Sequence, residues 1–211
     1  MWTIDAVGFM GYKPETKERP LIKWGNSKLP DTTIVFNITP AKECSSRRLG
    51  FCQVMKNGGK CYGDGPERAW KRTVIPYRYN QMAFWETHTA EQIAGYIVSW
   101  DKRKKTRATH VRFNEVGEVK NQADIRKLST VARILKENGY SSQIYSARSD
   151  LDWSYCDDVV VNGSGWTADN RFEYVPKGHT PPAGELVCPM DCKVCALCTV
   201  KGGRTIYVKH H

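Results

Sequence analysis

Long hydrophobic runs are absent from this sequence, and so are the marks of a secretory leader. No apolar stretch among the 211 residues approaches the roughly 18–20 residues that a membrane-spanning helix needs. The first twenty residues lack the basic start, apolar centre and small-residue cleavage site of a signal peptide. We therefore expect a cytoplasmic protein without membrane contact. In that reducing compartment, clustered cysteines bind metals more often than they form disulfides.

Acidic residues are in the minority. Lysine and arginine number 32 against 22 aspartate and glutamate residues, which gives a formal net charge of +10. The basic residues concentrate in the stretch 102–105 with Arg107, and at Arg68, Lys71 and Arg72. A basic surface can attract nucleic acid or other anions, although the same residues also suit the solvated face of a helix. Nucleic acid is therefore one partner that the sequence leaves open.

Strand and helix patterns alternate along the chain. Strand patterns cover residues 32–38, 110–114, 142–147, 158–164 and 205–209. Helix patterns cover 66 to about 85, with an expected break or kink at Pro76, then 89–100 and 121–140. This alternation favours βαβ units and a parallel sheet. Four or five strands are too few for an eight-fold barrel, so we predict an α/β fold with cysteine-rich loops, either a partial (β/α) barrel or an open, mostly parallel sheet.

We expect one domain over residues 1–211. It divides into an irregular lead-in at 1–30, a βα core at 31–170 and a C-terminal cysteine-rich metal-binding segment at 171–211. Ligands of open α/β sheets bind at the carboxyl ends of the strands. The candidate site residues all follow, or end, predicted strands.

Four of the eight cysteines form one compact run near the C-terminus. Cys188, Cys192, Cys195 and Cys198 are spaced C-x3-C-x2-C-x2-C. Structural zinc sites usually join two C-x2-C pairs through a longer loop, whereas four closely spaced cysteines are more typical of a [4Fe–4S] cluster. Disulfides between such near neighbours would be strained. We predict an iron–sulfur cluster at this run, with zinc as the alternative metal.

A second group contains Cys44, Cys52 and Cys61, spaced C-x7-C-x8-C in a glycine-rich loop after the first predicted strand. Three thiolates would leave one iron open to a substrate or another exogenous ligand. These residues are a candidate second metal site, or a site shared with the C-terminal run. The simpler interpretation is that one or two of them are ordinary buried thiols. Cys156 stands alone, and we interpret it as structural.

Short motifs spread over the chain are similar to those of a known family. They are GNSK (25–28), IVFNI (34–38), KCY (60–62), VRFNEVGE (111–118), IYSARSD (144–150), VVNGSG (160–165) and the terminal cysteine run. From about residue 22 onward, the chain resembles the phage gene-product-88-like proteins, a group of small cysteine-rich proteins. The resemblance implies a phage-encoded protein that acts in the cytoplasm of the host cell.

A more distant likeness is to the radical S-adenosylmethionine enzymes. Those are partial or complete (β/α) barrels with three cysteines in the loop after the first strand. Cys44, Cys52 and Cys61 occupy that place, but their spacing is wider than the C-x3-C-x2-C of that superfamily. Gly117 and Glu118 resemble the turn with which the superfamily holds the amino group of S-adenosylmethionine. A plain turn between a strand and a helix is the other interpretation.

Three more polar residues are candidates for ligand contact. Asn162 and Ser164 belong to a glycine-containing turn whose backbone amides can hold an anion or a cofactor carboxylate. Arg148 follows another predicted strand, where it can bind a polar ligand or pair with Asp150.

Three functional hypotheses remain at this point. The first is a phage-type iron–sulfur protein with a redox or electron-transfer role, acting with a redox partner or a small-molecule ligand. The second is an enzyme related to the radical S-adenosylmethionine catalysts, in which Cys44, Cys52 and Cys61 hold the reactive cluster. The third is a zinc-stabilised nucleic-acid-binding protein. Whether the protein is an enzyme stays open.

Overall fold

The computed structural model describes residues 2–4, 10–12 and 19–209, so part of the predicted lead-in at 1–30 lies outside the described residues. The strands are β1 (Trp2–Ile4), β2 (Met10–Tyr12), β3 (Lys23–Trp24), β4 (Thr33–Phe36), β5 (His110–Phe113), β6 (Ser141–Ser146), β7 (Val160–Ser164), β8 (Asn170–Val175) and β9 (Thr205–Lys209). The helices are α1 (Ser45–Arg48), α2 (Gln53–Lys56), α3 (Asp64–Ala69), α4 (Val74–Thr87), α5 (Ala90–Asp101) and α6 (Gln122–Glu137), with short 3-10 turns η1 (Ala41–Glu43) and η2 (Leu197–Thr199).

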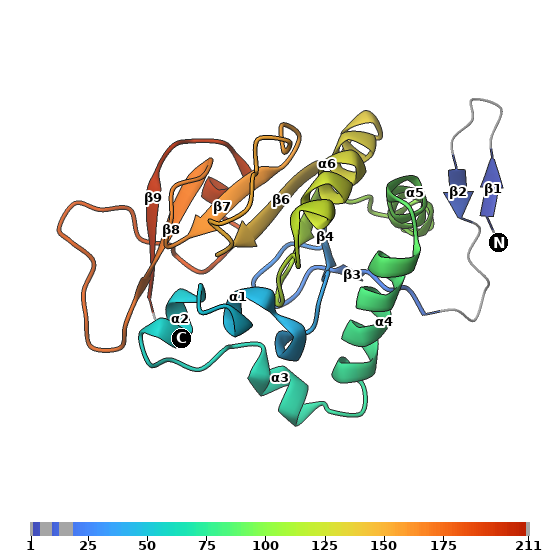
Figure 1. Cartoon of the computed structure of the whole chain (residues 1–211). Coiled ribbons are helices and arrows are strands. Elements are labelled where there is room, and N and C mark those ends of the chain that lie inside the picture. Colours follow the sequence, from blue (N-terminus) through green and yellow to red (C-terminus); the bar gives the residue numbers. More distant parts are fainter. Residues whose placement is uncertain (1, 5–9, 13–18, 210–211) are drawn as a thin grey trace.

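Seven strands form the main sheet, in the order β3-β4-β5-β6-β7-β8-β9. β3 runs antiparallel to β4, and every other neighbouring pair is parallel. The sheet is open and does not close into a barrel, which confirms the predicted α/β class. Because β4 to β9 run parallel to one another, all their carboxyl ends lie on the same side of the sheet (Figure 1).

For the main sheet, the predicted number of strands was too low because β3 and β8 were not recognised; β1 and β2, which form a separate two-stranded sheet, were not predicted either. β3 is only two residues long, so it offers almost no pattern. β8 does alternate, but only residues 165–169 separate it from its parallel neighbour β7. A parallel crossover ordinarily needs a dozen or more residues, so a strand at this place contradicts the usual spacing. β8 and β9 both belong to the main sheet, so the predicted C-terminal segment contributes two of its strands.

Two of the three predicted long helices are confirmed together with their caps. At the start of α5, the Gln92 amide donates to the Thr89 hydroxyl over 3.3 Å, and the Thr89 amide donates to the Gln92 side chain over 2.9 Å. At the start of α6, the Asn121 side chain accepts from the amides of Ala123 and Asp124.

The predicted helix over 66–85 is instead two helices, and the break lies before Pro76. α3 ends at Ala69, and α4 begins at Val74. Pro76 therefore falls in the first turn of α4, where a backbone N–H has no intrahelical partner and its loss is tolerated.

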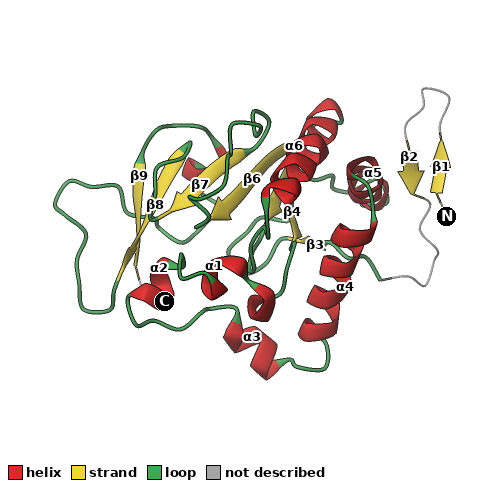
Figure 2. Cartoon of the chain, viewed as in Figure 1, coloured by secondary structure: helices red, strands yellow, loops and turns green. Residues whose placement is uncertain are grey.

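The two faces of the sheet have different coverings. One face packs against α5 and α6 and forms the main hydrophobic core, which includes Ile34, Phe36, Val111, Phe113, Ile144, Ile93, Ile97, Ile125, Leu128 and Leu135. The opposite face, here called the cysteine face, carries Arg112, Tyr145, Asn162, Phe172 and Ile206, which alternate with the core residues along the strands. Figure 2 shows that β7, β8 and β9 are joined by loops rather than by long helices.

None of the helices in the described part of the chain has both the length and the apolar character required to cross a bilayer.

Candidate metal centre

The C-terminal cysteine run lies in the long connection between β8 and β9, at the cysteine face. The Cys188 amide donates to the Tyr207 carbonyl of β9 over 2.8 Å. The Cys192 amide donates to the Lys28 carbonyl, in the connection between β3 and β4, over 3.1 Å. The segment is thus held by backbone hydrogen bonds from two directions.

Two buried asparagines attach the end of this segment to the sheet. Asn162 donates its side-chain amide to the Cys198 carbonyl over 3.0 Å. Asn170 donates to the Asn162 side-chain oxygen over 3.0 Å and to the Val200 carbonyl over 2.9 Å, and it accepts from the Gly202 amide. The amide groups of both side chains therefore have partners, and their positions are fixed. Asn162, predicted as a ligand contact, lies beneath the cysteine segment.

The four thiols of the run lie close enough to influence one another. Burial raises the pKa of the Cys188 thiol, and the neighbouring Cys198 and Cys195 add to the rise. Burial also raises the pKa of Cys192, with a further contribution from Cys198, while Arg112 opposes the rise. Cys198 itself is buried against Phe172 and Ile206. The run therefore gathers its four sulfurs in one partly buried region.

Arg112 is a cation on the cysteine face that sequence analysis did not select. Its guanidinium stacks over the Tyr145 ring, 4.8 Å from the centroid, and its buried Nε has no hydrogen-bond partner among the described residues. Cys192 and Tyr62 both lie within its electrostatic reach, and Tyr62 is next to Cys61 of the other group. Arg112 is therefore within electrostatic reach of one cysteine of the C-terminal run and of the residue next to Cys61. The sequence pattern that could have identified Arg112 is a charged residue placed between two apolar strand residues, Val111 and Phe113.

The N-terminal cysteine group lies beyond the carboxyl end of β4, as predicted. Cys44 immediately precedes α1, Cys52 immediately precedes α2, and Cys61 lies three residues before α3. Burial raises the pKa of the Cys44 thiol to about 12, and the charge of Glu118 together with Cys52 and Cys61 adds to the rise. The fold thus brings the three thiols of this C-x7-C-x8-C loop within electrostatic reach of one another.

Glu118, the predicted cofactor contact, is only 2% exposed and is surrounded by internal donors. Its carboxylate accepts from the Ser46 hydroxyl over 2.8 Å, the Ala147 amide over 2.9 Å and the Val119 amide over 3.0 Å. Burial nevertheless raises its pKa above the ordinary glutamate value. The structure therefore places Glu118 as a connector between the Cys44 loop and the end of β6.

Gly117, the other residue of this turn, has a conformational requirement. Its φ is +86°, and a Cβ atom would lie 1.9 Å from the Thr39 carbonyl oxygen. Only glycine fits this close approach between the turn after β5 and the chain after β4.

Arg148 is almost fully buried and also supports the Cys44 loop. It pairs with Asp150 through two bonds of 2.7 and 2.8 Å, and it donates to the Ser45 hydroxyl over 2.9 Å. The predicted Arg148–Asp150 pair is thus present. Ser164, the remaining candidate, ends β7 and is partly exposed.

All eight cysteines are free thiols. Within residues 2–4, 10–12 and 19–209, no three Cys, His, Asp or Glu side chains stand in an arrangement that encloses a metal ion.

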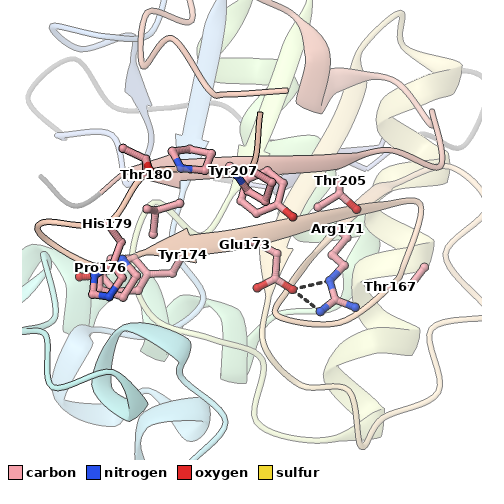
Figure 3. A pocket seen from close by; sticks show the side chains of 12 residues that line it. Thr167, Arg171, Glu173, Tyr174, Pro176, His179, Thr180, Thr205 and Tyr207 are labelled. Atoms are coloured by element: carbon pink, nitrogen blue, oxygen red, sulfur yellow. Dashed lines mark hydrogen bonds and ion pairs between the residues drawn. The ribbon is translucent and has the colours of Figure 1, made fainter. Parts of the chain in front are cut away.

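A pocket of about 450 Å³ lies elsewhere, against β8 and β9 (Figure 3). Arg171, Glu173 and Tyr207 line it, and they alternate with Phe172 and Ile206, so they belong to the side opposite the cysteine segment. Arg171 pairs with Glu173 inside the pocket. No cysteine contributes to its lining.

The basic stretch after α5, predicted as a nucleic-acid contact, directs much of its charge onto the protein itself. Arg103 lies over the Trp100 ring at 4.7 Å, and Lys104 lies over the Trp24 ring at 5.0 Å. Arg107 pairs with Asp101 over 2.7 Å.

No protein-family model, curated protein or solved structure matches this chain.

Proposed function

We propose that this protein is an iron–sulfur protein of the phage type considered above, in which Cys188, Cys192, Cys195 and Cys198 ligate a [4Fe–4S] cluster. The observation that carries the proposal is the position of the run. One loop presents four mutually interacting thiols against the cysteine face, next to a cation. When bound, such a cluster supplies reversible one-electron transfer. The free thiols also suit a protein of the reducing cytoplasm, which we propose as its location.

The charges around the run support an anionic group. A cubane with four thiolates has a net charge of about −2 when oxidised. Arg112 acts on Cys192, and Lys28 acts on Cys188, in each case favouring the thiolate. A buried arginine Nε without a partner is costly unless something anionic completes its surroundings. A cluster bound by this run would place an anionic group near Arg112.

Hydrogen bonds to the rest of the fold would hold the four cysteine ligands in position. The backbone bonds of Cys188 and Cys192, and the asparagine pair beneath Cys198, position the segment. Burial and the nearby Cys198 thiol raise the pKa of Tyr145, whose hydroxyl would offer a polar contact to a ligating sulfur. Such contacts to the sulfurs help to set the potential of iron–sulfur centres.

The radical S-adenosylmethionine type of enzyme is a second candidate. The observation that favours it is the convergence of Cys44, Cys52 and Cys61 at the edge where the parallel strands end. Three thiolates would hold a second cluster with one open iron, and the C-terminal run would then be an auxiliary centre. Binding of S-adenosylmethionine, measured by calorimetry, and its reductive cleavage to 5′-deoxyadenosine would distinguish this enzyme from an electron carrier.

The main proposal is tested by reconstituting wild type and two cysteine variants with iron and sulfide under anaerobic conditions. Cys195→Ala should lose the broad visible absorption of the C-terminal cluster. Cys156→Ala is the matched control, because Cys156 is a buried thiol outside both groups, and it should keep the wild-type spectrum. Equal spectra from wild type and Cys195→Ala would contradict the proposed ligation.

A further inference from the structure

Trp70 differs from the other described tryptophans in its exposure. It is 65% exposed, the largest value among the exposed aromatic side chains of the described residues. The indole N–H groups of Trp24, Trp85, Trp153 and Trp166 donate to protein oxygens, and Trp100 is buried. An indole left in water has a large apolar surface that is available to a ligand.

Three exposed basic residues lie within two positions of Trp70 in the sequence. Arg68, Lys71 and Arg72 are all exposed, and their side chains make no hydrogen bond or ion pair with any residue that the structure describes. Trp70, Lys71 and Arg72 also line a shallow hollow of about 320 Å³, together with Ala69 and Thr73. Trp70 and two of the basic residues therefore border the same space.

The backbone that presents Trp70 is firmly attached. The Trp70 amide donates to the Pro66 carbonyl over 2.9 Å, and its carbonyl accepts from the Val74 amide over 2.8 Å. α3 is anchored by the buried pair of Glu67 with Arg78, at 2.8 Å, and Glu67 also accepts from the Ala41 amide over 2.8 Å. The exposure of Trp70 thus belongs to a supported turn between α3 and α4.

We propose that Trp70, with Arg68, Lys71 and Arg72, is a contact site for single-stranded nucleic acid. An unpaired base stacks on the indole, and the three cations contact the flanking phosphates. Duplex nucleic acid fits less well, because its bases are already stacked and paired. The overall charge of +10 complements such a polyanion and favours its approach.

The basic stretch at 102–105 is the less suitable footprint. Two of its cations are directed at Trp100 and Trp24, so those rings are already covered. An anionic membrane is also less suitable for the Trp70 site. Its immediate neighbours in the hollow, Ala69 and Thr73, provide little apolar area for insertion beside the single indole.

The test measures binding of a fluorescein-labelled oligothymidylate of about 15 nucleotides by anisotropy, over a series of salt concentrations. Trp70→Ala should weaken binding roughly 5- to 150-fold, since one base–aromatic stack contributes about 1–3 kcal/mol. Trp70→Phe should recover most of the affinity. Lys71→Gln/Arg72→Gln should lower the slope of log affinity against log salt by about 1.4, or about 0.7 for each lost contact.

Lys102→Gln/Lys105→Gln removes the same amount of charge at the other basic stretch and serves as the matched control. It should change the affinity much less than Lys71→Gln/Arg72→Gln does. Circular dichroism and the melting temperature should stay unchanged in all variants, because the replaced side chains are exposed or unpaired. An unchanged affinity in Trp70→Ala, or equal losses in the two charge variants, would overturn the proposal. So would Trp70-dependent sedimentation with phosphatidylserine vesicles in the absence of oligonucleotide binding.

Discussion

The two cysteine groups are held by different kinds of interaction. Around the N-terminal group, the contacts come from buried charged side chains, namely Glu118 and Arg148, which join the Cys44 loop to the ends of β5 and β6. Around the C-terminal run, they come from backbone hydrogen bonds and the neutral pair Asn162 and Asn170. The C-terminal run is therefore attached directly to the sheet, while the N-terminal group depends on a charge network. This difference predicts that the two groups respond separately to mutation.

Removing cysteines in pairs gives the largest expected effect. Cys192→Ala/Cys195→Ala should abolish the absorption of the C-terminal cluster after anaerobic reconstitution. Cys52→Ala/Cys61→Ala should leave that absorption in place and should reduce iron only if the N-terminal group also holds a cluster. Visible spectra and iron analysis measure both. If Cys52→Ala/Cys61→Ala also abolished the absorption of the C-terminal cluster, the two groups would form one shared site, and the comparison would fail.

Breaking the charge network should destabilise the N-terminal group most. Glu118→Ala leaves three buried donors, from Ser46, Val119 and Ala147, without their acceptor. We expect a loss of about 4 kcal/mol in the free energy of unfolding, measured with urea. Glu118→Gln keeps the size and one acceptor and should cost clearly less. A loss below about 1 kcal/mol in Glu118→Ala would mean that the network does not hold the loop.

His110, at the start of β5, gives a pH dependence. Burial lowers the pKa of His110 in β5 to about 4, against about 6.5 when unfolded. The unfolded chain therefore binds more protons between these values, and the contribution of neutral His110 to stability is lost as the pH falls from about 6.5 through about 4. The loss amounts to roughly 3 kcal/mol. Urea midpoints of wild type and His110→Gln, compared at neutral pH and at about pH 4, should converge as the pH falls. A constant difference would contradict the prediction.

Releasing the asparagine pair should loosen the C-terminal run alone. Asn170→Ala removes donors to Asn162 and Val200 and the acceptor for Gly202, and should cost about 2–3 kcal/mol. It should also speed loss of the C-terminal cluster to a chelator. Asn57→Ala, at an exposed asparagine, is the control and should change neither quantity measurably. Chelator sensitivity equal to that of wild type would show that the pair does not position the segment.

The smallest expected effect is electrostatic. Arg112→Gln removes the cation next to Cys192, and a cation favours the more negative, reduced state of a cluster. The reduction potential should therefore fall, by on the order of 60 mV, which is a tenfold change in a one-electron equilibrium. Anaerobic titration followed by absorption gives this value. Lys105→Gln, which removes an exposed charge, is the control and should leave the reduction potential nearly unchanged. A higher reduction potential in Arg112→Gln would contradict the proposed effect of the Arg112 cation on the cluster.

Sequence patterns predicted the regular parts of this fold because local physics decides them. The capping box at Thr89, the N-cap at Asn121 and the β-rich runs that became β4 to β7 all depend on neighbours within a few residues. β8 was missed because its parallel pairing with β7 across the short connection 165–169 depends on tertiary contacts, and no local sequence pattern indicates it. The break between α3 and α4 was misplaced because a proline can either end a helix or fit its first turn.

The candidate site was predicted in its residues but not in its connections. Cysteine spacing identified the two groups, yet only the fold could show that Asn162 and Glu118 contact those segments rather than open space. Arg112 lies within a short strand pattern, and nothing local indicates that its side chain is directed at a cysteine more than seventy residues away.

Analysis of iron, acid-labile sulfide and zinc in protein purified without oxygen tests the central claim most directly. We predict iron and sulfide in equal amounts, with about four of each per chain if only the C-terminal run is occupied and about eight if both groups are, and a broad visible band that bleaches on reduction. One zinc per chain without sulfide would contradict the assignment of an iron–sulfur centre to Cys188, Cys192, Cys195 and Cys198.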